Sequence, residues 1–311
     1  MSDVIVIGGG LTGLSAAWEL ERLGVNYTLI EVKPRLSGSI YSERAAGFVI
    51  DHGPFVLEKY GDWPFLAELG LQDSLMALGR YRDGELVIFA EGTQTLVDAL
   101  AKRLTAPIML RMAVSSLGTI DDKRYGVCLE NGVLLEARGI VVAVPARYAD
   151  HMLRTLAPEA ALLLSDYRYD PVARVHLGFQ AQAVPHDLPV ITGGLFKFAE
   201  RYALPGRVPA DHVLVRAGVR LDVEPSVATP DQALAAVRAH FEAEPVLARS
   251  HYWPEADSLT RFLPEHSANM DAIEAALPPG IVLVGSDYRA RRLPDQVAQG
   301  RSAARKIADV L

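Results

Sequence analysis

The stretch DVIVIGGGLTGLSAAWELERLGVNYTLIE, residues 3–31, decides the fold of this chain. Residues 4–7 form an uninterrupted apolar run, as expected of a parallel strand that is covered on both faces. A turn with the order G-x-G-x-x-G follows, then an amphipathic helical pattern. The glycines of this turn are Gly8, Gly10 and Gly13. A second apolar run, residues 27–30, ends in Glu31. This order predicts an α/β fold that opens with a Rossmann-like, dinucleotide-binding unit.

The residue types in this unit suit a nucleotide. Glycines permit a tight turn and let the backbone approach a pyrophosphate, and the helix N-terminus at Leu11 and Thr12 favours negative charge. Glu31 follows the last glycine at close to the spacing of about 20 residues expected of a ribose-binding acid. Its carboxylate would repel a 2′-phosphate, so NADP is disfavoured. At this point the choice between NAD and FAD is open.

The next segment, RLSGSIYSERAAGFVIDHGPF (residues 35–55), resembles the flavin-containing amine oxidase and protoporphyrinogen oxidase superfamily. In that family an arginine and a small-residue turn follow the ribose acid, and a G-x-x-x-D-x-G strand then leads to the flavin ring. The matching residues are Arg35, Gly38, Gly47, Asp51 and Gly53, followed by Pro54 and Phe55. Ser39 stands where many amine oxidases have a second arginine, which tilts the resemblance toward protoporphyrinogen oxidases. The resemblance implies FAD rather than NAD.

The other end of the chain, residues 280–311, resembles the closing unit of the same family. Its strand is followed by a loop at Gly285 and Ser286 and by a final helix. The resemblance implies that this helix begins under the flavin pyrimidine, around Asp295, Gln296 and Val297. Other contacts follow from the same resemblance: Val114 would meet the adenine, and Trp253 and Tyr288 would wall the flavin or substrate. No cysteine lies near this end, so we expect FAD to be non-covalent.

The remaining patterns predict the domain organisation. We expect a discontinuous FAD-binding domain with a parallel sheet and a β-hairpin or meander, made of residues 1–58, 92–150 and 252–311. A smaller mixed α+β domain on the substrate side takes residues 59–91 and 151–251. Its expected elements are strands at 173–179, 190–198 and 212–219, and a helix at 230–242 capped by Thr229. Only Ala90 and Glu91 stand where relatives carry a long helical insertion that roofs the substrate cavity.

Composition excludes several other functions. The formal net charge is −7, which disfavours nucleic acid and anionic membranes as partners. The eight histidines show no paired ligand spacing, so we expect no metal site. No apolar run is long enough to span a bilayer, and the N-terminus reads as a strand, so we expect a cytoplasmic protein.

The family reaction is dehydrogenation of a C–N or C–C unit, with hydride passing to the flavin. The expected function is therefore an FAD-dependent oxidoreductase acting on an amine or a porphyrinogen-like substrate. Lys59 and Lys197 are the catalytic candidates, as lysines that would lie near the flavin. Two alternatives stay open. One is an oxidase whose roofless pocket is closed by a partner or a second subunit and that takes a bulky or protein-attached substrate. The other is a non-catalytic binding protein on this fold, like the Rab GDP-dissociation inhibitors.

Overall fold

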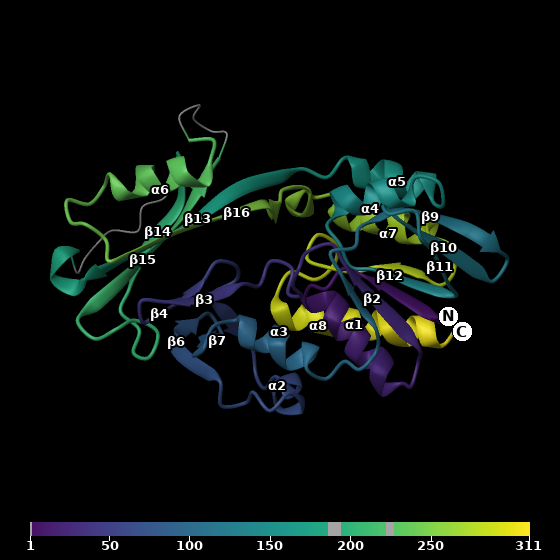
Figure 1. The fold of residues 1–311 in the computed structure, drawn as a ribbon, viewed down its shortest axis with the longest axis horizontal. Helices are drawn as coiled ribbons and strands as arrows, with labels where there is room; N and C mark the ends of the chain where they lie inside the picture. Colours follow the sequence, from purple (N-terminus) through teal and green to yellow (C-terminus); the bar gives the residue numbers. More distant parts are fainter. Residues whose placement is uncertain (1, 186–193, 222–226) are drawn as a thin grey trace.

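The computed structural model of the chain describes residues 2–185, 194–221 and 227–311. Two sheets lie at opposite ends of the elongated molecule, and two long strands, β13 (Tyr169–Gln180) and β16 (Leu247–Ser258), run between these ends (Figure 1). One smaller sheet lies beside the parallel sheet, and others lie below the two long strands (Figure 1). Both chain termini lie at the end that holds the parallel sheet (Figure 1).

The parallel sheet is the predicted Rossmann-like unit. Its five strands are all parallel, in the order β17-β12-β1-β2-β8. They are β17 (Ile281–Leu283), β12 (Gly139–Val142), β1 (Val4–Ile7), β2 (Tyr27–Glu31) and β8 (Ile108–Leu110). Along β1, Val4 and Val6 enter one apolar core, whereas Ile5 and Ile7 enter another. The α/β fold class and the doubly covered first strand are therefore confirmed.

Helices cover both faces of this sheet. One core contains residues of α1 (Leu11–Arg22), α3 (Gln94–Ala101) and α8 (Leu293–Ala308). The other core contains residues of α4 (Ala146–Leu153), α5 (Pro158–Ser165) and α7 (His266–Ala276). An antiparallel meander joins this second core: β9 (Val114–Asp121), β10 (Arg124–Leu129) and β11 (Leu134–Ala137). The turn from β10 to β11 contains Gly132 at φ +85°, which confirms the hairpin signal of Asn131 and Gly132.

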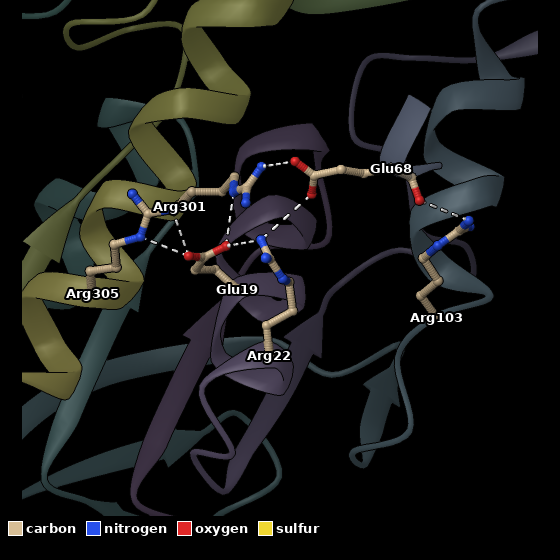
Figure 2. Close-up of polar contacts among 6 residues, drawn as sticks. All are labelled: Glu19, Arg22, Glu68, Arg103, Arg301 and Arg305. Atoms are coloured by element: carbon tan, nitrogen blue, oxygen red, sulfur yellow. Dashed lines mark hydrogen bonds and ion pairs between the residues drawn. The ribbon is translucent and has the colours of Figure 1, made fainter. Parts of the chain in front are cut away.

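The contact between α1 and α8 is unusually close. A Cβ atom at Gly300 would lie 2.3 Å from the carbonyl oxygen of Thr12, so only glycine fits there. Below this point Glu19 of α1, with a side chain only 5% exposed, accepts hydrogen bonds from Arg301 (2.8 Å) and Arg305 (2.7 Å) of α8. Arg22 and Glu68 extend the network to α2 (Pro64–Glu68), and Arg103, just after the end of α3, donates to the Glu68 carbonyl (Figure 2). These ion pairs hold α1 and α8, the first and last helices, against each other.

The second large sheet lies in the part of the chain that was predicted as the substrate side. Its antiparallel order is β14-β15-β13-β16. The strands are β13 (Tyr169–Gln180), β14 (Phe196–Tyr202), β15 (His212–Arg220) and β16 (Leu247–Ser258). They confirm the strands expected at 173–179 and 212–219. Of the strand expected at 190–198, residues 190–193 lie outside the described residues, residues 194–195 form a turn, and the strand begins at Phe196 and continues to Tyr202. Helix α6 (Pro230–Arg238) covers one face and has the predicted cap at Thr229. It ends four residues earlier than predicted, because the chain turns back there and Phe241 packs on Phe179, with ring centroids 5.0 Å apart.

The smaller elements connect the two ends. A hairpin is formed by β3 (Ser42–Ala45) and β4 (Phe48–Asp51), and a sheet by β5 (Leu57–Lys59), β7 (Gly84–Phe89) and β6 (Leu75–Tyr81). Short 3-10 turns lie at Ala181–Ala183 and Thr260–Phe262. Strand β7 is followed directly by α3, with no helical insertion between them. Apolar side chains of residues 57–89 share the core of α1 and α8, whereas those of 152–164 share the core of α4 and α7. The segments predicted on the substrate side are residues 59–91 and 151–251, so each of these cores combines residues of both predicted domains. The domain boundaries stay a prediction.

Within the described ranges, no helix is both long and apolar enough to cross a bilayer. The same part of the chain contains no group of three or more metal-ligating side chains placed to hold an ion.

Candidate active site

The glycine turn lies at the carboxyl end of β1. Gly8 has φ +106°, and a Cβ atom there would lie 2.3 Å from the carbonyl oxygen of Ala143 at the end of β12. A Cβ atom at Gly13 would lie 2.0 Å from the carbonyl oxygen of Gly8. Both positions therefore require glycine, as predicted from the need for a tight turn and close packing of helix on strand.

The N-terminus of α1 is suited to a phosphate group. Gly10 is its N-cap, Leu11 and Thr12 begin the first turn, and that turn carries no acidic side chain. No side chain in the described ranges caps the N-terminus. The first N–H groups of a helix lack intrahelical partners and carry partial positive charge. Gly38, at φ +58°, faces this end: a Cβ atom there would lie 3.0 Å from the Cα atom of Gly10.

Glu31 is fixed beside the glycine turn. Its carboxylate, on a residue 6% exposed, accepts hydrogen bonds from the backbone N–H of Gly9 (2.6 Å) and of Lys33 (2.8 Å). Strand β2 thus delivers one carboxylate to the end of the sheet where α1 begins. The carboxylate can accept hydrogen bonds from a ribose, and the glycine turn with the open helix N-terminus can bind a pyrophosphate. These groups together fit a dinucleotide.

The small-residue turn after β2 is braced by Arg35. Its guanidinium donates to the carbonyls of Leu36 (3.3 Å) and Ile40 (3.4 Å) and to the Ser37 hydroxyl, and it lies 4.7 Å from the ring centre of Tyr41. Burial lowers the pKa of Arg35. The structure therefore gives Arg35 a bracing role, and its contact with the ribose–phosphate region stays a prediction.

Ser39 and Gly53 are brought into contact. A Cβ atom at Gly53 would lie 1.9 Å from the carbonyl oxygen of Ser39, so the segment after β4 crosses directly over the small-residue turn. Two separate parts of the sequence pattern, residues 35–39 and 51–55, thereby form one surface next to Gly10. The next residue, Pro54, accepts a hydrogen bond from the Thr93 hydroxyl (3.0 Å) at the start of α3.

The Asp51 carboxylate is occupied by hydrogen bonds from other parts of the chain. The residue is 2% exposed, and its carboxylate accepts bonds from the Arg207 guanidinium (2.6 Å), the Thr93 N–H (2.9 Å) and the Ser42 hydroxyl. Arg207, also 2% exposed, donates further to the carbonyls of Phe89 and Val49. This buried ion pair holds the end of β4 in place, so Asp51 acts on the site by positioning the Gly53 segment.

Phe55 and Trp253 flank that segment. Phe55 is buried, and two guanidiniums lie near its ring centre, those of Arg207 (5.0 Å) and Arg216 (5.2 Å). Trp253, on β16, donates its indole N–H to the carbonyl of His52 (2.6 Å) and lies 5.6 Å from the Lys33 ammonium group. Trp253 therefore connects the sheet that contains β13 and β16 to the segment that leads to Gly53.

The C-terminal unit meets the carboxyl end of β17. Gly285, at φ +144°, donates its N–H to the Gln299 side chain (2.9 Å), and the Ser286 carbonyl accepts from Arg261 (3.2 Å). Asp295 pairs with Arg292 at 2.8 Å at the start of α8. Two further residues in its first turns were predicted at the site: Gln296, half-buried, and Val297, buried in the core of α1. Val114, 8% exposed at the start of β9, lies in the core of α4.

Tyr288, which was predicted to line the flavin or substrate site, is buried. It is 2% exposed, and its hydroxyl donates to the Val144 carbonyl (2.8 Å) just after β12. Its neighbour Asp287 was not predicted. That carboxylate, 5% exposed, accepts from the Ala146 N–H (3.0 Å) and from the Tyr169 hydroxyl, and burial raises its pKa. Its place two residues after Gly285, at the end of a buried strand, was the signal that could have found it.

The two candidate lysines lie on different sheets, each in an ion pair. Lys59 on β5 contacts Glu85 (3.3 Å), and Lys197 on β14 contacts Asp170 (2.7 Å). Lys59 lines a cavity of about 100 Å³ that also contacts the N-terminus of α8 at Arg292 and Pro294.

A larger surface cavity, of about 420 Å³, lies between α4, α5 and the two long strands, β13 and β16. It is lined by residues that include Arg147, His151, Arg168, Tyr169 and Tyr252.

Sequence reasoning missed a group of basic side chains on the sheet next to Gly53. Arg216 on β15 donates to the Gly53 carbonyl (3.1 Å), and Arg174 and His176 share its side of the sheet. The alternation of arginine and histidine with valine and alanine along 172–177 was the available signal.

Comparison with known proteins agrees with this geometry. The sequence pattern of the family described as flavin containing amine oxidoreductase matches residues 55–308, and that of an NAD(P)-binding Rossmann-like domain matches residues 6–69. The fold and the site thus define a flavin-binding oxidoreductase class. The chain belongs to the flavin-containing amine oxidoreductase family.

Individual proteins with related sequences include two oxidases of porphyrinogens. The chain is 26% identical over 256 residues to a chloroplastic protoporphyrinogen oxidase of Oryza sativa subsp. japonica, covering 72% of this chain and 47% of that protein. It is 36% identical over 88 residues to coproporphyrinogen III oxidase of Bacillus subtilis (strain 168), covering 24% of this chain and 19% of that protein. The chain spans about half the length, or less, of these curated relatives.

Among solved structures, a putative protoporphyrinogen oxidase from Exiguobacterium sp. 255-15 has the same fold, with a TM-score of 0.81 at 17% identity over 99% of both chains. A triple mutant of putrescine oxidase gives a TM-score of 0.70 at 13% identity, over 100% of this chain and 99% of that one. The predictions of the family and of FAD as cofactor are confirmed.

Proposed function

We propose that this protein is an FAD-dependent oxidoreductase that removes hydride from a C–N or C–C unit of its substrate. The observation that carries the proposal is the Glu31 carboxylate, held at 2.6 Å by the Gly9 N–H beside the open N-terminus of α1. FAD, when bound, supplies the hydride acceptor. Its identity as the cofactor comes with the family, whereas the substrate and the reoxidant belong to the proposal.

The residues of this chain would divide the work. Glu31 and the α1 N-terminus would hold the ribose and the pyrophosphate. Asp51, through Arg207 and Thr93, fixes the approach of the Gly53 segment. The N-terminus of α8 carries partial positive charge, which favours a neighbouring group that becomes negative on reduction. Lys59 lines the cavity beside that helix end, so it remains the better placed of the two proposed lysines.

The test is the absorbance spectrum of the purified protein, followed by release and chromatographic identification of the cofactor. We expect a flavin spectrum, bleached by dithionite, and FAD released by heat alone, as a non-covalent cofactor requires. A colourless protein that takes up no added FAD would refute the proposal. Tight FAD binding with reversible reduction would exclude a purely non-catalytic role on this fold.

A second candidate is an oxidase whose pocket is completed by a partner or a second subunit. The direct passage from β7 to α3 favours it, since no helical roof lies between them. Sedimentation of the FAD-loaded protein, with turnover assays on free small amines, tests this idea. A monomer that oxidises such amines readily would count against it. The cytoplasmic location stays a prediction.

A further inference from the structure

Five ring side chains meet where the chain after β4 lies against the two long strands, β13 and β16. The rings of Tyr41 and His52 are stacked, with centroids 5.0 Å apart. The His52 ring also lies 5.1 Å from that of His176 on β13 and 5.2 Å from that of His251 on β16. His251 in turn lies 4.3 Å from the ring of Trp253. We call Tyr41, His52, His176, His251 and Trp253 the histidine junction.

The histidine junction also carries backbone contacts that place Gly53. The Trp253 indole N–H donates to the His52 carbonyl (2.6 Å), and the His52 N–H donates to the Tyr41 carbonyl (2.9 Å). Gly53, the next residue, crosses over the Ser39 carbonyl. Separation of the rings would therefore displace the surface that Gly53 and the small-residue turn form together.

The three histidines are shielded from water. His176 is fully buried, His52 is 2% exposed, and His251 is half-buried. Burial lowers the pKa of all three, and that of His251 falls to about 4. Each ring is therefore neutral at neutral pH, and the contacts of the junction are those of neutral imidazoles.

Charges of both signs surround His52. Burial lowers its pKa most, whereas the Glu43 carboxylate, 3.2 Å from Nε2, and Asp51 act in the opposite sense. Arg249 lowers the pKa further and also pairs with Glu43 (2.7 Å). The Nδ1 atom of His52 has no hydrogen-bond partner within the described ranges. A proton on this ring would therefore be solvated on one side only.

The groups around His251 disfavour a proton more strongly. Arg174 lies opposite it on β13, and Lys33 and Arg35, after β2, add positive charge. The Glu43 carboxylate acts in the opposite sense. A protonated His251 would thus meet several like charges in a half-buried place.

His176 is enclosed in a similar way. Arg216 lies opposite it on β15 and Arg249 opposite it on β16, while Glu200 of β14 lies opposite Arg216. The backbone of Asp51 favours the protonated ring, but burial outweighs it and keeps the pKa of His176 well below its ordinary value. The closed junction therefore excludes protons from its most buried ring.

Opening of the junction would return the histidines to water, where the ordinary pKa of an imidazole is about 6.5. Below that pH the open form binds protons that the closed form excludes, so acid favours opening. Each histidine contributes up to about tenfold per pH unit to the opening equilibrium. For His251 this contribution continues down to its pKa of about 4 in the closed form.

We propose that the histidine junction is an acid-sensitive contact that keeps FAD bound while its imidazoles are neutral, and that opens and releases FAD when they take up protons. The proposal rests on the proposed function, since FAD is the ligand that is released. The neutral rings hold the Gly53 segment and the small-residue turn together, and both belong to the predicted cofactor side. Protonation places like charges at ring centroids about 5 Å apart, which pushes these segments away from β16.

The test measures how fast FAD leaves the FAD-loaded protein, from the rise of free flavin fluorescence after dilution. We expect the rate at pH 5 to exceed that at pH 7.5 by at least about tenfold, with the far-UV circular dichroism unchanged. His251→Gln should reduce this ratio by at least about threefold, because glutamine takes up no proton there. His151→Gln is the matched control, since His151 is an exposed histidine of α4 outside the junction. Its ratio should stay within about twofold of that of the parent protein.

Equal ratios in the parent protein and in His251→Gln would overturn the proposal, since another group would then control release. A ratio near one in the parent protein would also overturn it. So would loss of the circular dichroism signal at pH 5, because release would then follow from unfolding of the whole chain.

A protein that takes up no FAD would refute the proposed function instead. Hydrogen exchange of residues 48–56 in the cofactor-free protein then tests the junction by itself. After correction for intrinsic exchange rates, protection should fall between pH 7.5 and pH 5, and it should fall less in His251→Gln. Protection that is independent of pH would overturn the proposed acid-sensitive contact.

Discussion

Glu31 joins the end of one strand to the backbone of the glycine turn, and we propose that nucleotide binding depends on it. It accepts from Gly9 at 2.6 Å and from Lys33 at 2.8 Å, so its position is fixed before any ligand arrives. A preorganised acceptor loses little entropy on binding, which is why a single carboxylate contributes strongly to affinity.

Replacing Glu31 tests this role. We expect Glu31→Ala to raise the Kd for FAD about tenfold or more, because a charge-assisted hydrogen bond contributes about 1.5–3 kcal/mol. Fluorescence titration of the cofactor-free protein with FAD measures the change. Glu130→Ala, an exposed acid at the β10–β11 turn, is the control and should leave the Kd unaltered. Unchanged affinity in Glu31→Ala would mean that the turn has been misinterpreted.

Gly53 is required by contact rather than by backbone conformation. Since a Cβ atom there would lie 1.9 Å from the Ser39 carbonyl oxygen, Gly53→Ala must displace one of the two segments. We expect a loss of at least about 2 kcal/mol in the free energy of unfolding, measured by urea denaturation, together with weaker FAD binding. Gly118→Ala on β9, where no described atom lies within 4 Å, should change stability by less than about 0.5 kcal/mol. Equal effects would show that the two segments are not in contact.

At the scale of elements, the first and last helices are joined by the buried carboxylate of Glu19 (Figure 2). Burial tends to raise the pKa of Glu19, but hydrogen bonds from Arg305 and Arg301 outweigh it and lower that pKa below the ordinary value of 4.5. A carboxyl group whose pKa is lower in the folded state stabilises the fold above its unfolded pKa. That stabilisation is lost as the pH falls through the folded value.

Glu19→Gln should therefore destabilise the protein by about 2 kcal/mol at neutral pH, because it removes the anion that Arg305 contacts and one of the two anions that Arg301 contacts. Urea denaturation between neutral pH and pH about 3 should also show a flatter acid limb in the variant, since the pH dependence of Glu19 is gone. The control is Glu244→Gln, whose exposed pair with Arg238 should contribute less than about 0.5 kcal/mol. An acid limb as steep as that of the parent would assign the pH dependence to other groups.

At the scale of the whole molecule, the ion pair of Asp51 and Arg207 connects residues 156 positions apart. It joins β4, the end of β7 and the loop before β15. Both side chains are at most 2% exposed, so their desolvation is offset only while both are present.

Arg207→Met should lower the free energy of unfolding by about 3–5 kcal/mol, because it strands a buried carboxylate. Adding Asp51→Asn to that variant should recover part of the loss, since the uncompensated charge is removed while an oxygen remains for the Thr93 N–H. Thermal or urea denaturation of the single and double variants measures the coupling. Additive losses in the double variant would contradict a buried, coupled pair.

Local signals account for what could be predicted. The period of apolar residues, the glycine order and Glu31 lie within one continuous stretch, so β1, α1 and β2 follow from neighbouring residues. The Thr229 cap and the Asn131–Gly132 turn are local in the same way. In contrast, Asp51 was predicted as a cofactor contact because its partner Arg207 cannot be found by spacing. Tyr288 was predicted as a wall, although its hydroxyl reaches Val144 across the sheet.

By itself, the sequence determined the Rossmann-like unit, the family and the cofactor, because those depend on residue order over short distances. Only the tertiary structure decided that residues 57–89 share a core with α8, and that Arg174 and Arg216 gather on Phe198 beside Gly53. The physical reason is that strand register sets which side chains share a face, and register between distant strands is fixed by packing of the whole chain.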